Sequence, residues 1–152
     1  MRGKVGVILG AVLLSAGCGS KDPLEGERPR VVPATGRVLY RGQPVEGAKV
    51  TFTNSAAGVS GYGETGPDGR FRLTTFKEGD GVVPGTQRVA VRKVEVIDRS
   101  KPGFDYSTSS EVPPPPEERW LIPRRYGNVA TSGLTVEVAE GAKNDFVLEL
   151  KD

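Results

Sequence analysis

Short runs of alternating apolar residues, separated by turn-forming residues, constrain the fold of this chain more than any other feature. Val38 and Tyr40 share one strand face, as do Val50 and Phe52 in the following run. A period of two puts alternate side chains on opposite faces of a strand. No stretch sustains a helical period, and only residues 116–127 have the makings of a helical turn. The pattern therefore predicts an all-β fold.

Turn signals divide these runs. In "GPDG", Pro67 presets its own backbone angle, and Asp68-Gly69 tolerates the left-handed region. About seven short strands of this kind fit a single Greek-key β-sandwich of about 100 residues. The expected core consists of inward-facing residues, which are Val50, Phe52, Phe71, Leu73, Val89, Val91, Leu134, Val136, Val138, Phe146 and Leu148.

Residues 82–98 are expected to form one long strand. Val89 and Val91 alternate in one phase, whereas the apolar phase shifts to Val94 and Val96 after Lys93. A shift of one residue moves side chains to the opposite face of a sheet. The sequence therefore predicts a β-bulge or a bend in the strand near Arg92 and Lys93.

Residues 99–119 interrupt the strand pattern with four consecutive prolines, which cannot join a hydrogen-bonded ladder. They are expected to form a long loop, either a mobile spacer or a surface for a partner. Phe104 and Tyr106 lie in this insertion, and Trp120 and Tyr126 follow it. Together these aromatic residues form a candidate sugar- or peptide-binding surface. Alternatively, Trp120 and Tyr126 cover one end of the core.

The N-terminus has the order of a secretory signal peptide. Arg2 and Lys4 precede an apolar run from Val5 to Ala16 that is shorter than the about 20 residues of a membrane-spanning helix. Small residues then lead to Cys18, the one cysteine of the chain.

Residues 15–18, "SAGC", resemble the lipobox of bacterial lipoproteins, although Ser15 stands where leucine is usual. The resemblance implies cleavage after Gly17 and acylation of Cys18, with palmitate-like chains holding the protein to a membrane of the cell envelope. Gly19 in place of aspartate favours the outer membrane over the inner one. The alternative is an ordinary cleaved signal with an incidental cysteine. Residues 18–33 are then a flexible tether, and residues 34–152 form the domain.

Charge and histidine content limit the chemistry of the mature chain. Loss of Arg2 and Lys4 with the signal reduces 21 basic residues to 19, which equals the 19 acidic ones. A neutral chain without a basic cluster is not expected to bind nucleic acid. The chain has no histidine, which excludes histidine-dependent hydrolysis and histidine-ligated metals. We expect no enzymatic activity and no cofactor.

Several carboxylates are candidate sites. Asp68 and Asp80 offer oxygen ligands for calcium, but both also suit turns, and they lack the clustered spacing of a calcium loop. Glu111, Glu117 and Glu118 resemble a glycosidase pair only in composition, because adjacent loop residues lack the opposed geometry of that chemistry. Turn chemistry and solvated charge explain these residues, so no metal site is expected.

Three motifs resemble carboxypeptidase regulatory-like domains of the transthyretin-like type. They are "GRVLYRGQPVEGAKVTF" at residues 36–52, "TGPDGRFRL" at 65–73 and "PGTQRVAV" at 84–91, where Gln87 replaces the usual tyrosine. The resemblance implies a β-sandwich that acts as a structural, scaffolding or binding module, without shared catalytic residues. Binding to an envelope protein or polysaccharide, or service as an accessory subunit of an envelope complex, both fit this expectation. A transthyretin-related hydrolase would need the histidines that this chain lacks.

Overall fold

A computed structural model describes residues 26–152 apart from 101, 106, 109 and 111. Ten strands and one short 3-10 helix, η1 (Arg124–Gly127), make up its regular structure, and the described residues contain no α-helix. The all-β prediction is therefore confirmed, and η1 provides the one helical turn expected in residues 116–127. The strands form several sheets, none closed into a barrel. They are β1 (Ala34–Tyr40), β2 (Gln43–Pro44), β3 (Lys49–Asn54), β4 (Val59–Glu64), β5 (Arg70–Arg72), β6 (Gly85–Arg92), β7 (Val94–Ile97), β8 (Glu117–Trp120), β9 (Leu134–Val138) and β10 (Asn144–Leu150).

The first sheet is built around β1. On one side β1 pairs in parallel with β10, and on the other side it pairs with β5 and then with β2. A two-residue turn joins β1 to β2, and its central residues Arg41 and Gly42 have φ of 53° and 76°. Positive φ at both central residues is required by a type I′ turn, whose backbone twist matches that of the two strands it joins.

The second sheet has the strand order β4-β3-β6-β9, antiparallel throughout. Its strand β4 was not foreseen, because glycine occupies its inward positions in place of apolar residues. A side chain at Gly61 would place its Cβ 2.3 Å from Cγ1 of Val82, and one at Gly63 would come within 2.6 Å of the Arg72 carbonyl oxygen. Glycine is thus needed where neighbouring segments approach this strand closely.

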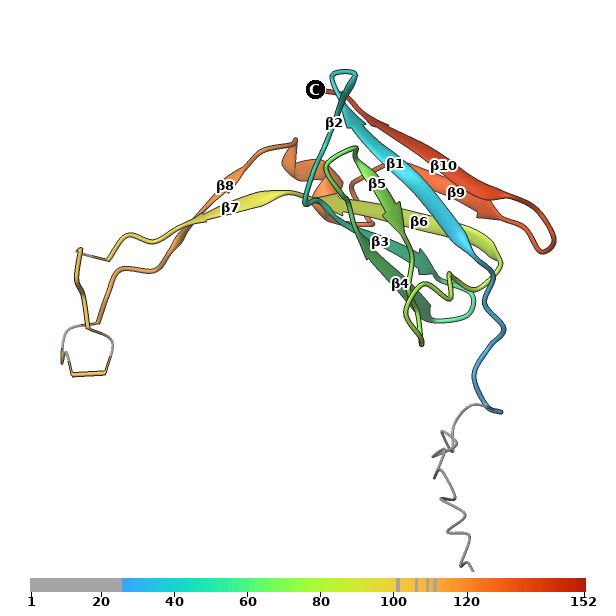
Figure 1. The fold of residues 1–152 in the computed structure, drawn as a ribbon, viewed down its shortest axis with the longest axis horizontal. Coiled ribbons are helices and arrows are strands. Elements are labelled where there is room, and N and C mark those ends of the chain that lie inside the picture. The colour runs from blue at the N-terminus through green and yellow to red at the C-terminus, as the bar shows by residue number, and fades with distance from the viewer. Residues whose placement is uncertain (1–25, 101, 106, 109, 111) are drawn as a thin grey trace, which may run out of the picture.

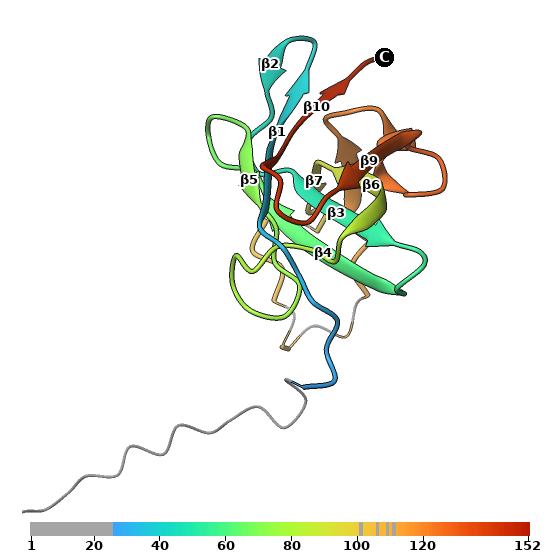
Figure 2. The ribbon, with the colours of Figure 1, turned by 90° about the vertical axis from the view of Figure 1, so that its right-hand side faces the viewer.

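One hydrophobic core lies between the two sheets, which form separate layers in Figures 1 and 2. Phe52 of the second sheet is fully buried, and its ring centroid lies 6.0 Å from that of Phe71 and 5.8 Å from that of Phe146. Eight of the expected core residues are buried, whereas Leu134, Val136 and Phe146 are half-buried at its margin. These three lie on β9 and β10, which lie at the outer edges of their sheets.

Gln87 is buried in the core at 1% exposure, at the position where the resembling family has tyrosine. Its side-chain amide donates hydrogen bonds to the carbonyl oxygens of Val83 (2.7 Å) and Gly85 (3.2 Å). A buried amide would otherwise incur a desolvation cost. The polar residue is thus tolerated because carbonyl groups just before β6 and at its first residue supply the acceptors.

The chain leaves the two sheets after Arg92, so the prediction of one long strand over residues 82–98 is wrong. Strand β6 ends at Arg92, and β7 begins at Val94 in a separate two-stranded sheet with β8. We call residues 94–120 the arm and the remaining strands the body. The arm extends away from the body in Figure 1 and lies behind it in Figure 2. The predicted irregularity at Lys93 is the point where the chain passes from body to arm.

The insertion at residues 99–119 is only partly a loop, because its last three residues belong to β8. Glu95 and Arg119 are cross-strand partners and form an ion pair, so the base of the arm is held by strand pairing.

None of the described helices is long and apolar enough to cross a membrane.

Candidate binding surfaces

The predicted lipidation site, Cys18 with Gly17 before it, lies outside the described residues. Part of the segment predicted to be a tether, residues 18–33, contacts the rest of the chain. Val32 and Val82 exchange backbone hydrogen bonds of 2.9 and 3.0 Å, and the Arg28 guanidinium lies 5.2 Å from the ring centroid of Phe76. A side chain at Gly81 would place its Cβ 1.8 Å from the Val32 carbonyl oxygen, so glycine permits this approach. The ordered body thus begins before residue 34.

Tyr126 closes one end of the core. Its side chain is buried, and its hydroxyl donates to the Lys151 carbonyl oxygen (3.1 Å) and accepts from the Lys151 N–H (3.0 Å). The Arg125 guanidinium also donates to this hydroxyl. Because its ring is buried and its hydroxyl is engaged, Tyr126 serves the core and is not available to a partner.

Trp120 fastens the arm to the body. Its half-buried ring lies beneath the guanidinium groups of Arg92 and Arg124, at 5.6 and 5.4 Å from the ring centroids. The edge of the indole fits against Gly127, where an added Cβ would come within 2.4 Å of the ring. Its Nε1 is buried and has no hydrogen-bond partner within the described part of the chain.

The four aromatic candidates do not form one surface. Trp120 pairs with Val94 at one end of the arm's strand ladder, whereas the half-buried Phe104 follows Ile97 at the other end. Tyr106 lies outside the described residues. Beside Phe104, the Asp105 carboxylate accepts hydrogen bonds from the hydroxyls of Ser107 and Thr108, which lower the pKa of Asp105 to about 2. The distal segment of the arm therefore carries its own local polar structure.

Three of the candidate carboxylates, Asp68, Asp80 and Glu118, make structural contacts, and Glu111 lies outside the described residues. Asp68 accepts a hydrogen bond from the Arg70 N–H, and Asp80 accepts from the N–H groups of Thr75, Phe76 and Lys77. Burial raises the pKa of Asp80, but these N–H groups outweigh it and leave the pKa below its ordinary value. Glu118 forms an ion pair with Arg92. Within residues 26–152 as described, no three acidic, cysteine or histidine residues cluster as metal ligands do.

A groove on the outer face of the second sheet was missed by the sequence analysis. Two neighbouring rows of cross-strand partners form it: Tyr62, Thr51 and Ala90 in one row, and Glu64, Lys49 and Arg92 in the next. Its volume is about 480 Å³, with Gly127 of η1 at the β6 side. We call it the sheet groove. The alternation of Tyr62 with two glycines was the one signal in the sequence that points to it.

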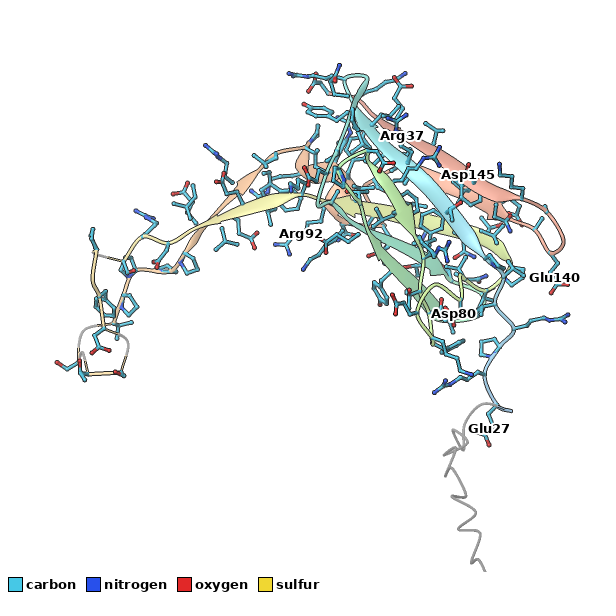
Figure 3. All side chains as sticks on the ribbon, viewed as in Figure 1. Glu27, Arg37, Asp80, Arg92, Glu140 and Asp145 are labelled. Carbon is cyan, nitrogen blue, oxygen red and sulfur yellow. The ribbon has the colours of Figure 1, made fainter. Side chains whose placement is uncertain are left out.

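The sheet groove reaches the base of the arm. A second hollow of about 220 Å³ shares Lys49 and Arg92 with it and is lined further by Val94, Val96 and Glu118 of the arm. Arg92, labelled in Figure 3 at the junction of arm and body, thus belongs to both. The arm and the groove are therefore neighbouring surfaces, although the aromatic residues of the arm do not line the groove.

Comparisons with known proteins leave the family open. No protein-family model matches the chain, and no curated protein matches it. Among solved structures, a 9R-lipoxygenase from Cyanothece PCC8801 is similar at 15% identity and a TM-score of 0.37. The match covers 97% of this chain, which spans 18% of the length of that protein. A similarity at this level carries no argument about fold or function.

Proposed function

We propose that this protein is a non-catalytic, lipid-anchored β-sandwich module of the bacterial cell envelope that binds a partner through its arm. In this proposal the two packed sheets are a Greek-key sandwich of the carboxypeptidase regulatory-like type. The three sequence motifs and the shared core between the sheets support that assignment. The lipobox-like segment before Cys18 supports the anchor, with the outer membrane as the favoured site.

The observation that carries the binding role is the exposure of apolar residues on the arm. Val96 is 62% exposed and Val112 is 92% exposed. A two-stranded ribbon alone is marginally stable in water, because no second layer covers it. The proline run beside Val112 favours an extended conformation, which lowers the entropy lost on binding. An arm of this kind gains most from a protein partner that covers it.

The anchor is tested by the mass of the protein purified from the envelope. We expect a chain that begins at Cys18 and carries acyl groups, and we expect Cys18→Ser to release a folded protein from the membrane. A free thiol at Cys18, or a mature chain that begins elsewhere, would contradict the anchor.

The binding role is tested with a shortened arm. Replacing residues 97–117 by Asn-Gly should leave a two-residue hairpin between Val96 and Glu118, which are cross-strand partners. This variant keeps Trp120 and the ion pair of Arg92 with Glu118. Proteins cross-linked to the wild type in detergent-solubilised envelope should be absent with the variant. Identical sets of cross-linked proteins would show that the arm is a spacer.

A further inference from the structure

We propose that the sheet groove binds a saccharide ring of a polysaccharide chain. The inference rests on the proposed binding function and adds a ligand class and a second contact surface, separate from the arm. The groove volume of about 480 Å³ lies within the range of small-ligand sites. Its floor consists of small side chains, Thr51 and Ala90, with Gly63 and Gly127 at its sides. Because these side chains are small, the floor of the groove leaves room for a flat ring.

Tyr62 supplies the apolar contact. It is 59% exposed on the outer face of β4, and its hydroxyl has no hydrogen-bond partner within the described residues. The face of an aromatic ring is electron-rich and attracts groups with positive edges. The C–H groups on one face of a pyranose ring have this polarity. An exposed tyrosine in a groove lined by small residues is therefore suited to stack against a sugar.

The adjacent row supplies hydrogen bonds. The Glu64 carboxylate can accept hydrogen bonds from a sugar, and the Lys49 ammonium can donate them. Neither side chain makes an ion pair or a side-chain hydrogen bond with the described residues. Lys49 lies between Glu64 and Arg92 in the cross-strand register. Arg92 is held in place by Glu118 and by the ring of Trp120. A sugar hydroxyl can both donate and accept a hydrogen bond. A row that holds one acceptor, Glu64, and two donors, Lys49 and Arg92, can therefore bind neighbouring hydroxyls of a sugar.

Charge favours a saccharide over an acidic peptide. Lys49 is offset by Glu64 in the same row, and Arg92 is neutralised by Glu118. The groove therefore carries little net charge with which to attract an anion. A ligand that offers many hydroxyls and one apolar face satisfies the groove better than a ligand recognised by its charge.

The test measures binding by the full mature chain to three probes by titration calorimetry. The probes are chitohexaose as a neutral saccharide, an oligogalacturonate as a carboxylated one, and a poly-glutamate peptide. We expect saccharide binding and a change in the emission of Trp120, the one tryptophan of the chain, whose ring contacts Gly127 beside the groove. Comparing the affinities for the two saccharides shows whether the groove prefers a neutral or an acidic polysaccharide.

Variants assign the binding to the groove. Tyr62→Ala should weaken saccharide binding by about tenfold, because the sugar loses its aromatic contact, and Tyr62→Phe should keep most of the affinity. Val147→Ala removes a side chain that is 68% exposed on the other sheet and should change nothing. Saccharide binding unaffected by Tyr62→Ala, binding of poly-glutamate alone, or no binding of either saccharide at millimolar concentration would overturn the inference.

The shortened arm separates this inference from the proposed function. If saccharides fail to bind but capture of envelope proteins still depends on the arm, the groove inference alone is wrong. If saccharides bind through Tyr62 while shortening the arm changes no captured protein, the groove is the binding surface and the proposed role of the arm is wrong.

Discussion

The body and the arm are built from the same element, the antiparallel strand pair, but they are stabilised in different ways. In the body, β3 has a strand on either side, and its residue Phe52 packs against two aromatic rings of the other sheet. In the arm, β7 pairs with β8 alone, and Val96 remains exposed. Burial between two layers therefore stabilises the body, whereas local pairs stabilise the arm. The difference indicates which region carries the fold and which depends on local contacts alone.

The largest expected effect is that of a deletion in the core of the body. Phe52→Ala should lower the free energy of unfolding by about 3–5 kcal/mol, since the residue is fully buried. Phe146→Ala should cost clearly less, because its side chain is half-buried. Urea unfolding monitored by circular dichroism measures both. Equal losses for the two variants would show that the core is not centred between the sheets.

A second effect concerns the close approach of strands in the body. A Cβ at Gly36 would lie 2.5 Å from the Phe146 carbonyl oxygen and 2.6 Å from the Phe71 ring. Gly36→Ala should therefore cost about 1–3 kcal/mol, as overpacking does. Gly26→Ala is the control, because nothing lies within 4 Å of its Cβ. A neutral Gly36→Ala would contradict the packing of β1 against β10.

A smaller expected effect is a pH-dependent loss of stability when Asp80, a residue of the body, is replaced. The folded state lowers the pKa of Asp80, so its contribution to stability is present above the unfolded pKa of about 3.9 and is lost as the pH falls through the folded pKa. Asp80→Asn should destabilise the body at pH 7, and the difference from wild type should shrink on acidification. Urea unfolding at pH 7 and at acid pH measures it.

Asp105→Asn is the matched variant in the arm. The pKa of Asp105 is lowered to about 2 by the hydroxyls of Ser107 and Thr108, yet these contacts stay within the distal segment of the arm. Unfolding of the body should not respond to this substitution at either pH. A response equal to that of Asp80→Asn would mean that arm and body unfold as one unit.

The smallest expected effect is that of shortening the arm on stability. Replacement of residues 97–117 by Asn-Gly should leave the unfolding midpoint of the body nearly unchanged, because none of the described residues in that segment belongs to the core. Thermal unfolding monitored by circular dichroism measures the midpoint. A marked loss of stability would show that the arm supports the body.

The sequence predicted the body better than the arm. The inward valines of β3 and β6 were correctly placed, since alternation is a local property. The sequence did not predict strand β4, because Gly61 and Gly63 replace the apolar residues expected at its inward positions. Glycine is needed there because other segments approach closely, which the local sequence does not show. The sequence also did not predict that the chain changes sheet at Lys93, because the alternation of apolar residues does not show which strand each segment pairs with.

The candidate surfaces were harder to predict for the same reason. Trp120 and Tyr126 looked equivalent in sequence, but Tyr126 is buried at the end of the core and Trp120 fastens the arm. The sheet groove joins Tyr62, Lys49 and Arg92, which lie on three strands and meet through register alone. Pairing over long range, which no local pattern encodes, creates that surface.

Amide hydrogen exchange of the intact protein tests most directly whether body and arm are separate units. Amides of β3 and β6 should exchange only when the body unfolds, whereas amides of β7 and β8 should open locally and exchange at least about 100-fold faster. The measurement compares the two strand pairs in one sample under native conditions. Fast exchange confined to the arm is the predicted result. Equal protection of β7, β8 and the body strands would contradict the account.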